Sequence, residues 1–160
     1  MALSTIDSVH LGRCIDLARE ALDAGDEPFG SVLVSASGTV LFEDRNRVAA
    51  GDRTRHPEFE IARWSAAHLS AAQRAEGTVY TSGEHCPMCA AAHAWVGLGR
   101  IVYASSSRQL SDWLRELGAP PPPVAALPID TVAPGVPVDG PSPDLAPVVR
   151  ELHRAWFTRG

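Results

Sequence analysis

The chain has 160 residues, the length of one domain, with 45% hydrophobic and 21% charged residues, an ordinary composition for a globular protein. Its formal net charge is −5 and it contains no run of Lys or Arg, so nucleic acid is disfavoured as the main partner. No apolar run approaches a membrane span, and charged residues interrupt the segment where a signal peptide needs an apolar core. We therefore expect one domain over residues 1–160, in the cytoplasm and without a membrane partner.

The first elements along the chain are a helix and a hairpin. Ser4 and Asp7 have the spacing of a capping box, and the apolar residues behind them recur at helical spacing up to Gly25, which ends the helix. The run GSVLVSASGTVLFEDRN then contains two β-rich segments joined at Ser-Gly. This pattern predicts a β-hairpin over residues 30–46.

Helical and strand patterns alternate after the hairpin. Helices are predicted over residues 57–70, 87–98 and 108–117, and strands over residues 78–82 and 100–104. This alternation favours an α/β layered fold with a partly parallel sheet.

The composition changes near the C-terminus. Ten of the 13 prolines lie between Pro120 and Pro147, four of them consecutive, which favours a stiff, extended backbone. We interpret this proline-rich segment as a rigid connector rather than as a ligand for a proline-binding domain, because few basic residues flank the prolines. The last run, DLAPVVRELHRAWFTRG, predicts a closing helix capped by Asp144.

Two short motifs carry the chemistry of a metal site. His56 precedes Pro57 and Cys86 precedes Pro87, so each candidate ligand stands at the start of a predicted helix. Cys89 is three residues after Cys86 and can point to the same side of the first turn. Helix N-termini favour thiolates. One imidazole and two thiolates are a ligand set that catalytic Zn²⁺ uses, with the fourth position open to water. We therefore predict one Zn²⁺ per chain.

These motifs also allow other interpretations. A Cys-x-x-Cys pair alone could be a redox dithiol, but a histidine about 30 residues upstream, also at a helix start, favours zinc. His93 would close the site as a fourth ligand, so we interpret it as a packing residue. Glu58, two residues after His56, is the candidate proton carrier. Glu60 lies on another face of the helix and is interpreted as a solvated surface acid.

His-x-Glu followed by Cys-x-x-Cys at this spacing resembles the cytidine-deaminase superfamily, in the branch of guanine, cytosine and tRNA adenosine deaminases. EPFGSVLV resembles the family's Pro-Phe-Gly-Ala strand opening, and CPMCAAAHAW resembles the guanine-deaminase form of the second motif. The resemblance covers about residues 5–105. It implies a three-layer α/β/α fold with a mixed five-stranded sheet flanked by helices, a homodimer, and contact of the 119–160 segment with a partner subunit.

The resemblance also implies substrate contacts. Asn46 inherits the role of the family's substrate-binding Asn, and Phe29 and Trp95 lie in the matching motifs. The family usually has His-Ala-Glu and Glu-Pro-Cys, whereas this chain has Pro57 in the first motif and His85 in the second. His85 is therefore a further candidate substrate contact.

Two more candidates lie beyond the second motif. Guanine deaminases place an acid after the fourth strand to read the guanine N–H edge, and Asp112 is the acid in that segment here. In guanine deaminases the C-terminal segment also closes a neighbouring active site, which makes Phe157 a candidate.

These features predict zinc-dependent hydrolytic deamination of a nucleobase or nucleoside-like heterocycle of the guanine, cytosine or amino-triazine type. A tRNA adenosine deaminase is the alternative within the superfamily. The net negative charge of the chain disfavours it, because tRNA is a polyanion. A non-catalytic, zinc-stabilised interaction protein is the alternative of another class, and it would need a fourth protein ligand on the metal.

Overall fold

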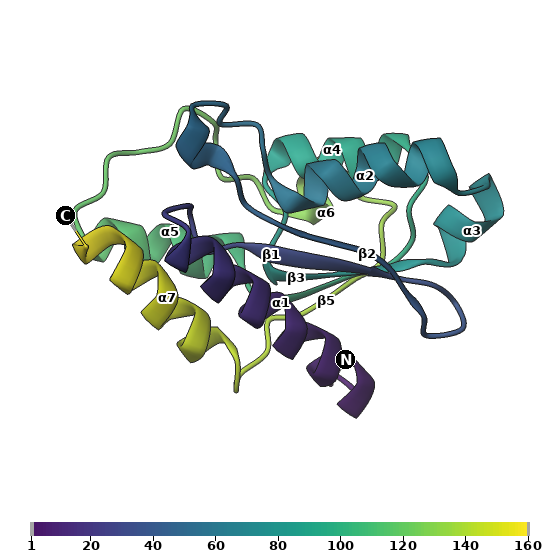
Figure 1. Cartoon of the computed structure of the whole chain (residues 1–160), viewed down its shortest axis with the longest axis horizontal. Coiled ribbons are helices and arrows are strands. Elements are labelled where there is room, and N and C mark those ends of the chain that lie inside the picture. Colours follow the sequence, from purple (N-terminus) through teal and green to yellow (C-terminus); the bar gives the residue numbers. More distant parts are fainter. Residues whose placement is uncertain (1, 160) are drawn as a thin grey trace.

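A computed structural model of the chain describes residues 2–159, which form one sheet between two layers of helices (Figure 1). The strands are β1 (Gly30–Val34), β2 (Val40–Arg45), β3 (Thr78–Gly83), β4 (Ile101–Ser105) and β5 (Val138–Asp139). Their order in the sheet is β2-β1-β3-β4-β5. Strand β1 is antiparallel to β2 and β3, whereas β3, β4 and β5 are parallel. The predicted mixed five-stranded sheet is therefore confirmed.

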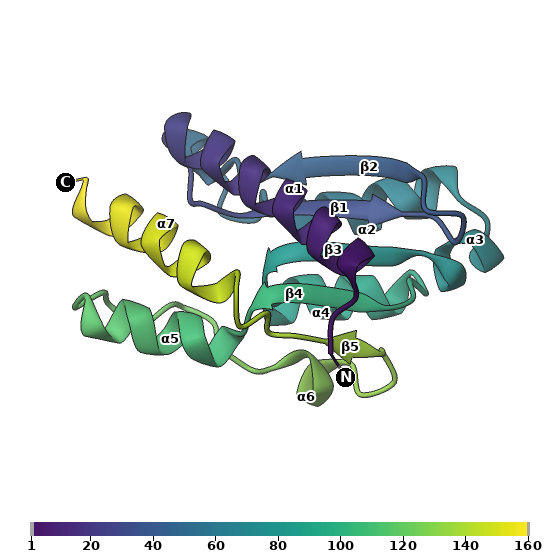
Figure 2. The same cartoon turned by 90° about the horizontal axis from the view of Figure 1, so that it is seen from below.

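The helices divide between the two faces of the sheet (Figures 1 and 2). One face carries α1 (Thr5–Asp23) and α7 (Ala146–Thr158), with α5 (Ser107–Glu116) beside α7. The other face carries α2 (Pro57–His68) and α4 (Pro87–Trp95), with α3 (Ala71–Glu76) after α2. Two short helices, η1 (Val48–Ala50) and α6 (Ile129–Val132), lie in the connections. None of the helices in the described part of the chain is long and apolar enough to cross a membrane.

Both faces of the sheet are covered, so the interior strand β1 is buried along its whole length. Val32 and Val34 pack in the core beneath α1, whereas Leu33 packs in the core beneath α2. This alternation follows from the two-residue period of a strand. Ser31 and Thr81 are direct partners in the β1–β3 register, and they have the same parity as Leu33. Their hydroxyl groups therefore face the α2 side.

Local signals set most helix ends. The Ser4 hydroxyl accepts a hydrogen bond from the Asp7 N–H, and the Asp7 carboxylate accepts one from the Ser4 N–H, so the capping box is confirmed. Gly25 has φ of 89° just beyond α1. The predicted cap of the last helix at Asp144 is wrong. Helix α7 begins after Leu145, whose N–H donates instead to the Ser142 hydroxyl at 3.2 Å.

The proline-rich segment continues the sheet, which its composition did not predict. Residues 120–128 run exposed across the surface, and then the buried Ile129 opens α6. Strand β5 follows and adds to the sheet beside β4. Helix α7 packs on α1, α5 and β4 of its own chain. Contact of residues 119–160 with a partner subunit stays a prediction.

A carboxylate network ties the start of α1 to the sheet. Asp7 Oδ1 accepts hydrogen bonds from the Tyr80 hydroxyl at 3.0 Å and from Arg100 Nη1 at 2.9 Å. Arg100 Nε also donates to Asp139 at 2.7 Å. Burial raises the pKa of Asp7, but the Arg100 guanidinium and hydrogen bonds from Ser4 and Tyr80 outweigh it. Together they hold the pKa of Asp7 well below its usual range.

Replacing Asp7 with Asn should lower the free energy of unfolding by about 2 kcal/mol at pH 7, because Arg100 loses one of its two anionic partners within residues 2–159 and keeps only Asp139. The folded-state pKa of Asp7 is depressed, so its carboxylate stabilises the fold above about pH 4 and ceases to do so as the pH falls toward that pKa. The stabilities of the two proteins should therefore converge in acid. Urea unfolding followed by circular dichroism at several pH values measures this.

Asp16→Asn is the matched control, because Asp16 forms an exposed pair with Arg19 on the same helix. This change should cost less than about 0.5 kcal/mol. An Asp7→Asn variant as stable at neutral pH as the parent would contradict the assignment.

Candidate metal centre and active site

The three predicted metal ligands stand at the beginnings of two helices. His56 is the N-cap residue of α2 and Cys86 is the N-cap residue of α4, both in extended backbone. Pro57 and Pro87 occupy the first helical position, where the N–H that proline lacks would have had no intrahelical partner. Cys89 follows in the first turn of α4. Helices α2 and α4 pack against each other, which brings their ligands together.

The spacing of the ligand atoms fits zinc. His56 Nδ1 lies 3.4 Å from Cys86 Sγ and 3.5 Å from Cys89 Sγ, and all three atoms lie within 4.8 Å of one another. A tetrahedral zinc with ordinary Zn–N and Zn–S bonds separates nitrogen from sulfur by about 3.6 Å. Within residues 2–159 the group consists of these three ligands. His56, Cys86 and Cys89 are therefore positioned to bind one metal ion, as the sequence predicted.

The electrostatics of the cysteine pair also suit a cation. Hydrogen bonding with Cys89 and with His56 lowers the pKa of Cys86 to about 4. The neighbouring Cys86 sulfur and burial raise the pKa of Cys89, because a second thiolate beside the first is unfavourable in a buried site. The hydrogen bond to Cys86 raises the pKa of His56. One sulfur is thus ready as a thiolate, and a metal ion relieves the repulsion that opposes the second.

Glu58 is buried beside this group, in the first turn of α2. Its Oε1 accepts hydrogen bonds from Thr81 Oγ1 at 2.7 Å and from Ser31 Oγ at 2.8 Å. Burial raises the pKa of Glu58 above its usual value, while the bond from Thr81, the nearby His56 and the bond from Ser31 oppose the rise. Glu60, in contrast, pairs with Arg55 at the surface.

Asn46 and Phe29 lie next to each other. The Asn46 N–H donates to the Phe29 carbonyl at 3.0 Å, and Asn46 Oδ1 accepts the Val48 N–H at 3.1 Å. Asn46 is buried, and its Nδ2 has no hydrogen-bond partner within the described residues. The Phe29 ring packs on Gly83, where a Cβ atom would lie 3.2 Å from the ring. Phe29 therefore contacts the last residue of β3, three residues before Cys86.

His93 and His85 form a buried pair of rings. His93 Nε2 is bound to the Gly99 carbonyl at 2.7 Å, so His93 packs and does not ligate, as predicted. His85 stands edge-on to His93 with ring centroids 5.4 Å apart, and neither of its ring nitrogens has a partner in the described part of the chain. His85 is 1% exposed, so its predicted contact with substrate stays a prediction.

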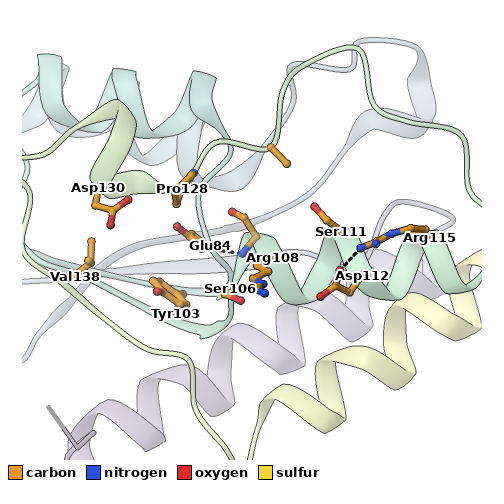
Figure 3. A pocket seen from close by; sticks show the side chains of 12 residues that line it. Glu84, Tyr103, Ser106, Arg108, Ser111, Asp112, Arg115, Pro128, Asp130 and Val138 are labelled. Atoms are coloured by element: carbon orange, nitrogen blue, oxygen red, sulfur yellow. Dashed lines mark hydrogen bonds and ion pairs between the residues drawn. The ribbon is translucent and has the colours of Figure 1, made fainter.

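Asp112 lies in a surface groove of about 600 Å³ between α5 and the proline-rich segment, which Glu84 also lines (Figure 3). It forms an ion pair with Arg115 of the same helix. Two other candidates are not brought to the metal group of their own chain. Trp95 ends α4, two turns beyond Cys89, and is 89% exposed. Phe157 is partly exposed near the end of α7.

The sequence interpretation missed three residues that contact this region. Ser31 and Thr81 donate hydrogen bonds to Glu58. The sequence has Ser31 where the family's Pro-Phe-Gly-Ala motif has alanine, and this difference is the signal that could have indicated Ser31. Glu84 accepts the Ser107 N–H at 2.8 Å and the Ile129 N–H at 2.9 Å. It therefore ties the loop before Cys86 to the start of α5 and to the proline-rich segment. No pattern in the sequence indicates these two backbone partners.

Comparison with known proteins agrees with the geometry. Residues 4–105 match the family described as the cytidine and deoxycytidylate deaminase zinc-binding region. The chain is 32% identical over 120 residues to a probable cytosine deaminase of Schizosaccharomyces pombe, an alignment that covers 75% of this chain and 73% of the relative. It is 37% identical over 97 residues to the guanine deaminase of Bacillus subtilis, covering 59% of this chain and 62% of the relative.

The fold has a solved counterpart. The guanine deaminase of Nitrosomonas europaea superposes with a TM-score of 0.70, covering 98% of this chain and 87% of that one at 22% identity. At that identity the likeness shows the fold alone. The zinc-ligand geometry and the match over residues 4–105 together show that this chain belongs to the cytidine and deoxycytidylate deaminase zinc-binding family.

Proposed function

We propose that the protein removes the exocyclic amine of a small, uncharged nucleobase-type heterocycle by hydrolysis and releases ammonia. The observation that carries this proposal is a three-ligand zinc group with the buried carboxylate of Glu58 beside it. A structural zinc site would normally have a fourth Cys or His ligand. The cytosine and guanine deaminases among the relatives support the same reaction.

The proposed chemistry needs one proton carrier. Bound to the three ligands, zinc supplies a Lewis acid that makes water nucleophilic near neutral pH. Glu58 takes a proton from the water that attacks the amine-bearing ring carbon, and it delivers that proton to a ring nitrogen. It then helps to protonate the departing amine, so that water is consumed and ammonia is released. Proton transfer of this kind contributes about 10² to 10⁴ in rate.

Asn46 is proposed to orient the ring. Its Oδ1 is already occupied by the Val48 N–H, so the side chain offers its Nδ2 hydrogens as donors. It therefore fits a ring edge that presents an acceptor, such as a carbonyl oxygen or an unprotonated nitrogen. The neighbouring Phe29 offers an apolar ring to the substrate.

The charges near the site favour an uncharged substrate over a polyanion. Three arginines around the segment between β2 and α2 each contact a carboxylate, in the pairs Arg47–Asp44, Arg53–Glu27 and Arg55–Glu60. This segment therefore has little surplus positive charge for phosphates. Asp112 forms an ion pair with Arg115. This pairing supports a substrate whose ring needs no contact with an acidic residue at this position. These features favour a cytosine or amino-triazine type of ring over guanine and over tRNA.

We also propose that the protein works in the cytoplasm as a homodimer. Within residues 2–159 none of the three cysteines forms a disulfide, which supports a reducing compartment. An 89% exposed tryptophan, Trp95, supports an interface near the end of α4. Residues 119–160 and Phe157 are proposed to contact the partner subunit, while residues 1–160 form one deaminase domain.

Loss of a ligand should remove the metal. The parent protein should contain about one zinc per chain, whereas His56→Ala and Cys89→Ser should lose most of it because two protein ligands hold zinc weakly. Metal analysis of dialysed protein measures the content. His93→Gln is the control and should keep its zinc, since His93 binds Gly99. Full zinc content in Cys89→Ser would refute the ligand set.

Glu58→Gln should keep zinc and lower kcat about 10²- to 10⁴-fold, because the amide cannot carry the proton. Ammonia release should be measured over aminated pyrimidines, triazines and purines, which also identifies the ring. Glu60→Gln is the matched control and should stay within about twofold of the parent, because Glu60 pairs at the surface. Activity of Glu58→Gln within a few fold of the parent would show that another group carries the proton.

Asn46→Asp should raise KM at least about tenfold, because the carboxylate keeps the acceptor for the Val48 N–H but no longer donates to the ring. Steady-state kinetics on the best substrate of the panel measure this. An unchanged KM would remove Asn46 from the substrate contacts.

A further inference from the structure

Two hydroxyl groups of the sheet converge on one oxygen of Glu58. Thr81 Oγ1 lies 2.7 Å and Ser31 Oγ lies 2.8 Å from Glu58 Oε1. Both residues are completely buried. Buried hydroxyls need hydrogen-bond partners, but a partner elsewhere in the backbone would satisfy each of them equally well. Their convergence on a single carboxylate oxygen therefore needs a separate reason.

The sheet holds these two groups in place. Ser31 and Thr81 are direct cross-strand partners in the antiparallel register of β1 and β3, and their hydroxyls lie 2.9 Å apart. Strand β3 is the third of five strands and β1 lies beside it, so both have neighbours on each side. The β-branched side chain of Thr81 is also restricted at χ1. The donors therefore have a fixed position relative to α2.

The consequence for Glu58 is an asymmetric carboxylate. Oε1 accepts two hydrogen bonds, whereas no side chain within residues 2–159 is hydrogen-bonded to Oε2. We propose that Ser31 and Thr81 are positioning residues that hold Glu58 by Oε1 and reserve Oε2 for the proton that moves between water and substrate. This inference rests on the proposed function, in which Glu58 carries that proton.

The hydrogen bonds can also adapt during the reaction. Each hydroxyl has one hydrogen and a second acceptor within reach, which is the Gly83 carbonyl at 2.9 Å for Thr81 and the Thr81 oxygen for Ser31. When Oε2 takes up the proton, Oε1 stays an acceptor as the carbonyl oxygen of the acid, so both hydroxyls can keep their hydrogen bonds to it. If either bond weakens, Thr81 can donate to the Gly83 carbonyl and Ser31 can donate to Thr81, so neither buried hydroxyl is left without a partner.

Ser31 adds a donor that the family motif lacks, because that motif has Ala at this position. Alanine at residue 31 is therefore compatible with the fold, so a Ser31→Ala variant tests the hydroxyl without a packing defect. At Thr81, valine keeps the shape and removes the hydroxyl, whereas serine keeps the hydroxyl and removes a methyl group. The Thr81→Val and Thr81→Ser pair thus separates hydrogen bonding from packing.

The test compares the zinc-loaded full chain with five variants. Thr81→Val and Ser31→Ala should each lower kcat about tenfold, and the double variant should lower it further, with KM within about twofold of the parent. Thr81→Ser should keep kcat within about threefold. Ser65→Ala is the control for loss of a buried hydroxyl on α2, because Ser65 donates to the Ala62 carbonyl and, within residues 2–159, is not hydrogen-bonded to Glu58.

A second readout does not depend on turnover. The infrared carboxylate band of Glu58, identified as the band that Glu58→Gln removes, should shift in Ser31→Ala and Thr81→Val and not in Ser65→Ala. If the band stays in place, or if both variants keep kcat within twofold of an active parent, the proposal is overturned. A further outcome is that the parent protein releases no ammonia from any ring in the panel while the band still shifts in Ser31→Ala and Thr81→Val. That result would refute the proposed function, but it would still support the hydrogen bonds from Ser31 and Thr81 to Oε1.

Discussion

The site depends on the packing of α2 against α4, which brings the N-terminal ends of two helices to one place. Each helix carries a ligand at its N-cap and a proline at its first helical position, so each begins at a fixed point relative to its ligand. Two positive helix ends would by themselves repel a cation. The two sulfurs of Cys86 and Cys89 compensate for this as thiolates, and the helix ends in turn stabilise those thiolates.

Burial of Glu58 follows from the same arrangement. A carboxylate in the first turn of α2, two residues after a ligand, is carried into the space between the helix and the sheet. Removing a carboxylate from water is costly unless donors replace the lost hydration. The sheet provides those donors through Ser31 and Thr81. The residues positioned to bind a metal come from the helices, and the hydrogen bonds to Glu58 come from the strands.

The proline-rich segment is fastened to this region by Glu84. One carboxylate oxygen of Glu84 accepts the first N–H of α5 and the other accepts the Ile129 N–H at the start of α6. Glu84 lies two residues before Cys86, so the same loop positions a ligand and anchors the segment that leads to β5. The stiffness of the consecutive prolines fits this role, because an extended connector between two fixed points loses little conformational entropy on folding.

The sequence by itself determined the zinc ligands, the carboxylate beside them and most of the elements. His56, Glu58, Cys86 and Cys89 can be found from spacing because each motif is local and lies at a helix start. Four strands and the capping box at Ser4 follow from period and composition for the same reason. Only the tertiary structure decided what lies far apart in the chain. It paired Ser31 with Thr81, joined Glu84 to Ile129 by a hydrogen bond, and formed β5 from proline-rich residues. Hydrogen bonds between distant segments leave no periodic pattern in a sequence, so none of these contacts could be predicted from it. It also placed Trp95 at the surface, since which side of α4 is covered depends on the neighbours that the fold supplies.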